Sequence, residues 1–182
     1  MIDISNSYSQ YLCALNVKPA IRFGGQMPQE EVLLLLRAHP VTQIFWVVNS
    51  ISLLVLLSVL DQFVPDFLNP QQILFLNVFS LAFIISYAWS NFLVWFFNVG
   101  IVTNQRIVDI DFGNILYQDV AAAKLQKIDE VNGVTAGFFG SIFNYGNIFV
   151  KTFSDENNIE FLNVPMPNEV VLIINSLAKP IE

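Results

Sequence analysis

Few residues in this chain have the types and the spacing that chemistry at a site requires. His39 is the only histidine and Cys13 the only cysteine, so neither has companions for a zinc site or a catalytic triad. Asp109 and Asp111 lie two apart on an expected strand and share one face, but they have no nucleophile or metal ligand beside them. The sequence therefore predicts a protein that is not an enzyme, with no catalytic residue, no metal site and no cofactor.

A glycine-rich run, GVTAGFFGSIFNYGN, covers residues 133–147. It lacks the Lys-Ser/Thr ending of a phosphate-binding loop, so we expect a sharp connection rather than a nucleotide site. Its aromatic residues leave two alternatives. They pack into a core, or Phe138, Phe139 and Phe143 contact a protein partner or the lipid headgroups.

The charge of the C-terminal half argues against anionic ligands. Residues 100–182 hold five basic and ten acidic residues, a net charge of −5. Recognition of anionic lipid requires a cluster of roughly four to eight Lys or Arg residues, and only Lys124 and Lys127 are near neighbours. We therefore expect no phosphoinositide binding and no nucleic-acid partner.

Two long uncharged segments dominate the elements that would position these residues. Hydrophobic residues make up 54% of the chain and charged residues 13%, whereas about 25% is usual in soluble domains. Residues 41–60 and 73–99 contain no charge, and about 20 apolar residues suffice to cross a bilayer. The sequence predicts two transmembrane helices in a lipid bilayer, joined by an extracytoplasmic turn at 61–72.

The positions of basic residues and tryptophans give an orientation. Lys and Arg residues occur before the first span and after the second, and the turn has none. By the positive-inside rule, this predicts a multi-pass protein of the inner (plasma) membrane with both termini cytoplasmic. Trp46, Trp89 and Trp95 fall near the cytoplasmic ends of the two spans, as in an aromatic belt.

Uncharged polar residues recur at helical spacing along both spans. We predict helix–helix contacts from Asn49 and Ser52 in the first span, and from four residues of the second. These four are Asn77, Ser80, Asn91 and Asn98. A transport path is the other interpretation, but proton and ion paths usually need acidic, basic or His residues, and neither span has one.

The rest of the chain has the patterns of a sheet and one helix. After residue 100, several short segments alternate apolar and polar residues and are separated by turn signals. Residues 167–179 have one apolar stripe, an acidic start and a basic end, which predict a helix. Residues 1–40 form a cytoplasmic lead-in, with a strand at 30–37 that joins the sheet. The sequence does not assign secondary structure to residues 1–30.

This arrangement resembles the bacterial pleckstrin-homology-like (PH-like) two-span membrane proteins. The resemblance is carried by EEVLLLLRAHP before the first span and by GIVTNQRIVDIDFGNI, LQKIDEV, GFFGSIFNYGNIFVKT and IEFLNVPMPNEVVLII after the second. It implies a membrane helical hairpin plus a cytoplasmic α+β PH-like domain at 100–182, with a bent antiparallel sheet or barrel capped by a C-terminal helix. Members of this family generally have no assigned enzymatic activity.

Three functions remain open from the sequence. The first is a membrane-tethered, non-enzymatic scaffold that binds a protein partner or forms a homo-oligomer. The second is an accessory subunit of a membrane transporter or export complex, docked through the Asn/Ser stripe. The third is a lipid-sensing domain.

Overall fold

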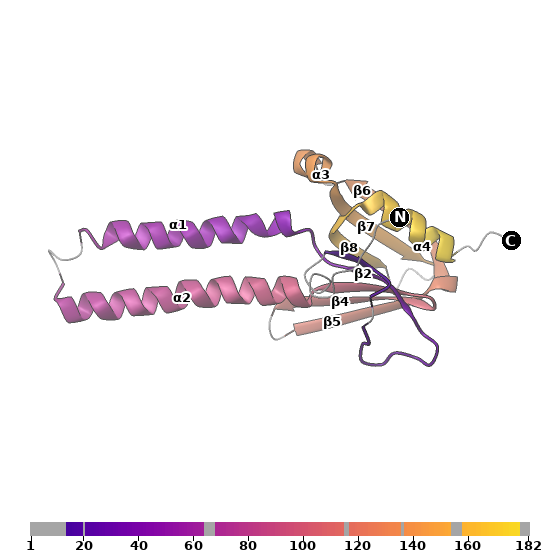
Figure 1. Ribbon diagram of the computed structural model, residues 1–182, viewed down its shortest axis with the longest axis horizontal. Helices are drawn as coiled ribbons and strands as arrows, with labels where there is room; N and C mark the ends of the chain where they lie inside the picture. The colour runs from indigo at the N-terminus through magenta and orange to yellow at the C-terminus, as the bar shows by residue number, and fades with distance from the viewer. Residues whose placement is uncertain are drawn as a thin grey trace.

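A computed structural model describes residues 14–19, 21–63, 68–114, 117–135, 137–153 and 158–178. Cys13, residues 64–67 of the predicted turn and Lys179 lie outside the described residues. Two long helices lie side by side and project from one end of a β-rich domain (Figure 1). We refer to the end of the domain that meets the helices as its hairpin end, and to the opposite end as its far end.

The helices begin and end where the local sequence requires. A 3₁₀ turn, η1 (Pro40–Gln43), leads into α1 (Ile44–Leu60), and α2 covers Pro70–Phe97. The second helix starts three residues before the predicted position because Pro70 suits the first helical turn. Gln72 also accepts a hydrogen bond from the N–H of Asn69 at 3.1 Å. It ends at Phe97 because the chain enters a strand at Val99.

Both helices are apolar over most of their circumference but are hardly covered by the rest of the protein. The segments Pro40–Leu60 and Pro70–Phe97 are long and apolar enough to cross a membrane, and only 6% of the most apolar stretch of each is buried. A core helix of a soluble protein with this composition would be mostly buried. The exposed apolar surface therefore needs a cover from outside the chain.

The β domain contains two antiparallel sheets. The first has the order β1 (Leu15–Val17), β2 (Val32–Leu36), β3 (Val99–Thr103), β4 (Arg106–Asn114) and β5 (Tyr117–Lys124). After the short η3 turn (Leu125–Lys127), the second has the order β6 (Ile128–Thr135), β7 (Tyr145–Thr152) and β8 (Ile159–Pro165). Helix α3 (Gly137–Phe143) lies between β6 and β7, and α4 (Pro167–Ala178) follows β8.

The helical hairpin is inserted between two strands that pair directly. Leu36 of β2 is opposite Gly100 of β3, and Val32 is opposite Thr103. The sheet is thus not confined to residues 100–182, because β1 and β2 precede the first helix. Strand β2 lies within the 30–37 segment predicted from sequence, and β1 lies in a segment to which the sequence assigned no structure.

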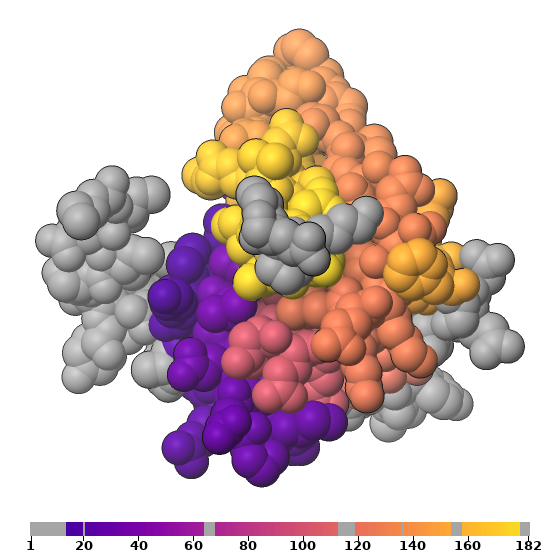
Figure 2. Space-filling model, turned by 90° about the vertical axis from the view of Figure 1, so that its right-hand side faces the viewer, coloured from indigo at the N-terminus to yellow at the C-terminus, as the bar shows by residue number. Residues whose placement is uncertain are grey.

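The main core lies between the two sheets and under α4. Its most deeply buried side chains include Leu34 and Leu36 of β2, Ile148 of β7 and Ile174 of α4. Helix α4 contacts β6 and β7, and Figure 2, which looks onto the far end of the domain, shows α4 lying beside these strands. Antiparallel sheets closed by a C-terminal helix are compatible with the PH-like fold that the resemblance implies.

The alternating strand directions determine which loops lie near the helices. Strand β3 leaves the end of α2, and each later strand reverses direction. The hairpin end therefore holds the end of β4, the start of β5, α3 and the junction between β8 and α4. The turn after β3, η3 and the last turn of α4 lie at the far end (Figure 1).

Candidate functional site at the helix–sheet junction

Helix α2 is fastened to the sheet by its last turn. The indole Nε1–H of Trp95 donates to the carbonyl of Ala38 at 2.9 Å. The N–H of Phe112 donates to Oδ1 of Asn98 at 2.6 Å, and the rings of Phe97 and Phe112 have centroids 5.6 Å apart. These contacts join the end of α2 to β4 and to the segment that leads into η1.

The residues that link β2 to the first helix are also held in place. The guanidinium of Arg37 lies 4.7 Å from the centre of the Phe96 ring, and burial lowers the pKa of Arg37. The N–H of His39 donates to the carbonyl of Asn163 at 2.7 Å, and its ring stacks on Tyr145 at 5.6 Å. The chain at His39, just before η1, is thus held against β7 and β8.

His39 has a specific local role. Its Nδ1 accepts a hydrogen bond from the N–H of Val41 at 3.2 Å and so caps the start of η1. Acceptance at Nδ1 requires that this nitrogen carry no proton. Burial lowers the pKa of His39, which favours the neutral form needed for the cap.

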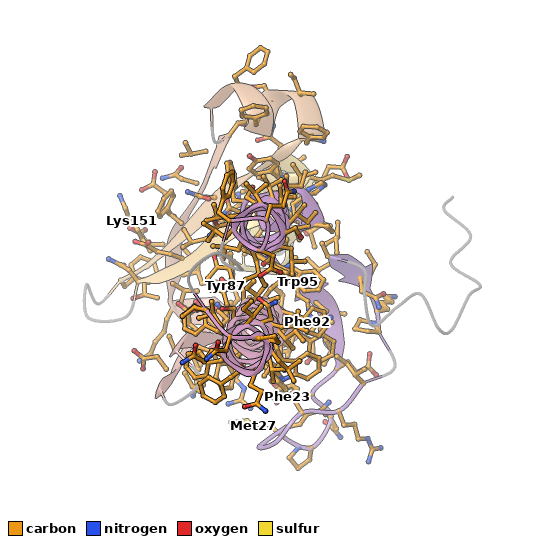
Figure 3. The ribbon with its side chains drawn as sticks, turned by 90° about the vertical axis from the view of Figure 1, so that its left-hand side faces the viewer. Phe23, Met27, Tyr87, Phe92, Trp95 and Lys151 are labelled. Carbon is orange, nitrogen blue, oxygen red and sulfur yellow. The ribbon has the colours of Figure 1, made fainter. Side chains whose placement is uncertain are left out.

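The three tryptophans predicted at the membrane interface lie in the parts of the two helices that are nearest to the β domain. Nε1–H of Trp46 donates to Oε1 of Gln43 at 2.8 Å, so this indole remains close to the start of α1. Trp89 is 59% exposed, with its ring 5.7 Å from that of Phe92. In the end-on view of Figure 3, Trp95 and Tyr87 lie toward the space between the two helices. The interface role of the three tryptophans stays a prediction.

The predicted asparagines have hydrogen-bond partners inside the chain. Nδ2 of Asn49 donates to the Tyr87 hydroxyl at 3.1 Å, and Nδ2 of Asn77 donates to a carboxylate oxygen of Asp61 at 3.0 Å. Asn91 donates to the carbonyl of Tyr87 within its own helix, at 2.8 Å. Asn98 bonds to the sheet, as described above. The stripe therefore joins α1 to α2 at two points and α2 to β4 at a third.

The two predicted serines are placed differently. Ser80 lines an apolar crevice between the helices together with Leu53, Leu57 and Ile84. Ser52 is exposed, whereas Ser50 is buried and donates to the carbonyl of Trp46 at 2.8 Å. In the first helix, the buried serine is thus Ser50 and not Ser52, which the spacing of the stripe had indicated.

A cavity of about 200 Å³ lies beneath the end of α2, between β4 and β8. The carboxylates of Asp109, Asp111 and Glu160 line it, with Arg37 and Asn98. Burial, and secondarily the negative charge of Asp111, raises the pKa of Asp109 to about 7. Within the part of the chain that the structure describes, no three His, Cys, Asp or Glu side chains are grouped closely enough to hold a metal ion.

The aromatic residues of the glycine-rich run lie on the surface. Phe138 is 75% exposed, and Phe139 and Phe143 of the same short helix are also exposed. The structure therefore does not pack these rings into the core. Contact with a partner or with lipid headgroups stays a prediction.

An ion pair between Arg106 and the buried carboxylate of Glu30 was not predicted from the sequence. The Arg106 guanidinium contacts both carboxylate oxygens of Glu30, at 2.9 and 3.1 Å, and Thr103 and the N–H of Met27 donate to the same carboxylate. Burial would raise the pKa of Glu30, but these hydrogen bonds and the charge of Arg106 outweigh it and lower the pKa. The pair ties residues 25–30 to the far end of the sheet.

Comparisons with known proteins add little. No family model and no curated protein matches the sequence. One solved structure is similar over part of its length, the crystal structure at 2.00 Å resolution of a DUF1696 family protein with a pleckstrin-homology domain from Shewanella loihica PV-4. It is 17% identical, with a TM-score of 0.32, and the match covers 44% of this chain and 67% of that one. So distant a likeness carries no argument about function.

Proposed function

We propose that the helical hairpin spans a membrane and holds the β domain in a fixed orientation at the cytoplasmic face, as a non-enzymatic scaffold for protein partners. The observation that carries this proposal is the insertion of the hairpin between the paired strands β2 and β3. Helix α2 leads into β3 through Asn98, and β2 leads through residues 37–39 into η1 and α1, so both helices are joined to adjacent strands of one sheet. A domain attached in this way has little freedom to turn relative to its membrane anchor.

The dimensions and the exposure of the helices support insertion. The 21 residues of Pro40–Leu60 extend about 31 Å at 1.5 Å per residue, close to the thickness of a hydrocarbon core of roughly 30 Å. Their exposed apolar side chains would be costly in water and are suited to lipid. The absence of Lys and Arg from residues 61–72 favours cytoplasmic termini in the inner (plasma) membrane.

The connections at the junction are too short to act as flexible linkers. Only Asn98 lies between α2 and β3, and residues 37–39 link β2 to η1. Both connections are bonded to the domain, through the Phe112 N–H to Asn98 and through the His39 N–H to Asn163. The surfaces of the β domain are therefore held at set heights above the bilayer.

The outer edge of β5 is the surface best suited to a protein partner. This strand ends the order of its sheet, and no other described strand pairs with its outer side. Val120 is 54% exposed, and Ala121 and Ala122 beside it leave the centre of the strand uncharged. Asp119 and Lys124 flank this centre, but residues 120–123 carry neither charge nor proline, and an open strand edge of this kind recruits an extended peptide by backbone hydrogen bonds. The partner is then another protein or a second copy of this chain.

Photo-crosslinking in native membranes tests the proposal. A photoreactive residue at Val120 should capture a reproducible protein adduct. The same residue at Leu172, which is exposed on α4, serves as the matched control and should not. Adding Ala122→Lys to the Val120 probe places a charge on the edge and should abolish the adduct. Failure to recover a reproducible adduct at Val120 would defeat the scaffold proposal.

The two other functions have less support. The asparagines that would dock an accessory subunit onto a transporter each make at least one hydrogen bond within the chain, so they are already engaged inside the protein. Sensing of anionic lipid is opposed by the net charge of −5 over residues 100–182. Neither function has an observation of its own that favours it.

A further inference from the structure

Helix α3 has its apolar face on the outside. Phe138, Phe139, Ile142 and Phe143 are all exposed, whereas Gly140 is buried. At 100° per residue, the four apolar side chains occupy one side of the helix and Gly140 the opposite side. A surface helix of a soluble domain buries its apolar side against the core. Helix α3 instead exposes its apolar side, which is unfavourable in water.

Contacts place α3 at the level where the first span begins. The helix ends at Phe143, and the carbonyl of the next residue, Asn144, accepts a hydrogen bond from Met166 N–H at 2.8 Å. Tyr145 then stacks on His39, one residue before the span starts at Pro40. Figure 1 shows α3 beside the base of the hairpin, and the end-on view of Figure 3 shows it displaced sideways from both helices.

The segment around α3 is uncharged. From Val131 to Val150 the chain contains no Lys, Arg, Asp or Glu, and only Glu130 and Lys151 flank it. This stretch runs from the middle of β6 through α3 and most of β7, so no charge on it would be desolvated if α3 entered a bilayer. The chain as a whole is negative at −7, so attraction to anionic lipid cannot drive such contact.

We propose that α3 is a third point of membrane attachment, with its phenylalanine face inserted into the boundary between headgroups and acyl chains. This inference rests on the proposed insertion of the hairpin, since the occupant is the bilayer that the hairpin spans. Interfacial helices bury their apolar face to a depth of about 5–10 Å. The hairpin sets the orientation of the domain relative to the two helices, and a third contact displaced to one side limits the tilt of the whole protein in the bilayer.

The test places one fluorophore at a time on the full-length chain, in a Cys13→Ser background. The environment-sensitive dye NBD is attached at Ile142→Cys on α3, at Val55→Cys in the middle of α1 or at Gln126→Cys at the far end. All three native residues are exposed. The protein is reconstituted in phosphatidylcholine vesicles that carry a nitroxide on part of the acyl chains. We expect quenching at positions 142 and 55, none at 126, and no change when anionic phosphatidylglycerol is added.

The outcomes separate this inference from the proposed function. Quenching at Val55→Cys without quenching at Ile142→Cys overturns the third attachment and leaves the spanning hairpin intact. Absence of quenching at both positions overturns both. A blue shift at Ile142→Cys that grows with protein density, without lipid quenching, shows that a second copy covers α3 and also overturns the inference.

A matched pair of substitutions gives a second readout. Replacing both Phe138 and Phe139 by serine should remove most of the quenching at Ile142→Cys. The exposed positions of these rings predict that the fold survives the change. Leu172→Ser on α4 removes a comparably exposed apolar side chain and should leave the quenching at position 142 unchanged. Equal quenching in both variants would contradict the role of the phenylalanine face.

Discussion

Replacing Asp109 by asparagine should stabilise the protein, and the gain should depend on pH. The carboxyl group lines the cavity beneath α2, together with Asp111, Glu160 and Arg37. Its pKa rises from an ordinary value of 3.8 to about 7, first because of burial and second because of the charge of Asp111. The folded state therefore binds more protons than the unfolded state between about pH 4 and 7.

The sign of the effect follows from this difference. Where the folded state binds more protons, the free energy of unfolding falls as pH rises. The carboxyl of Asp109 costs little near pH 4 and reaches its full cost above pH 7, where it is ionised in both states. A shift of about 3 pKa units corresponds to at most about 4 kcal/mol at 1.36 kcal/mol per unit. Because the group retains some access to water, we expect about 2 kcal/mol.

Thermal unfolding in detergent at pH 4.5 and pH 8 measures the gain. Asp109→Asn should raise Tm by about 4–8 °C at pH 8, since 1 kcal/mol shifts the Tm of a chain of this size by about 2–4 °C. The gain at pH 4.5 should be several times smaller. Asp111→Asn should recover part of the gain at pH 8, because it removes the second cause. Glu31→Gln, at an exposed carboxylate, serves as a control and should change little. An equal gain at both pH values, or a loss at pH 8, would refute the reasoning.

Two further substitutions test the packing and the ion pair. A Cβ at Gly100 would overlap the ring of Phe161 where the two sheets approach, so Gly100→Ala should lower the free energy of unfolding by about 1–3 kcal/mol. Denaturant titration should show no such loss for Gly24→Ala, where nothing lies within 4 Å of the added atom. Glu30→Gln removes the charge that pairs with Arg106 and should cost about 3 kcal/mol at pH 7. Because the pKa of Glu30 is lowered by folding, this cost should shrink as pH falls through that pKa, and a cost independent of pH would contradict the assignment.

The helices were the most predictable part of the fold. A run of about 20 residues without charge is a strong local signal, and both segments are helical over most of their predicted length. Their boundaries were less certain, because Pro70 both ends a turn and begins a helix. The apolar face of α4 was also predictable from the sequence, and Val170 and Ile174 of that face are fully buried. Each of these signals lies within one segment of the chain.

The junction could not be derived from local patterns. The pairing of β2 with β3 joins segments on either side of the hairpin, and the Glu30–Arg106 pair joins residues 76 apart in sequence. The orientation of α3 was ambiguous for a different reason. Seven residues with four large apolar side chains fit either a core helix or an exposed one. The burial of Gly140 and the exposure of the four large side chains distinguish the two.

The insertion of the hairpin between paired strands also limits how the two helices can move. Sliding α1 along α2 would shift β2 against β3, and a shift of one residue exchanges the two faces of a strand. Leu34 and Leu36 of β2 pack into the main core, while Leu35 packs into a second cluster on the other face, so a slip would misplace all three. A signal transmitted by sliding one helix along the other would therefore disrupt much of the core packing. This constraint agrees with a rigid hairpin that holds one face of the β domain against the bilayer. It favours a scaffold over a protein that transmits signals through helix movement.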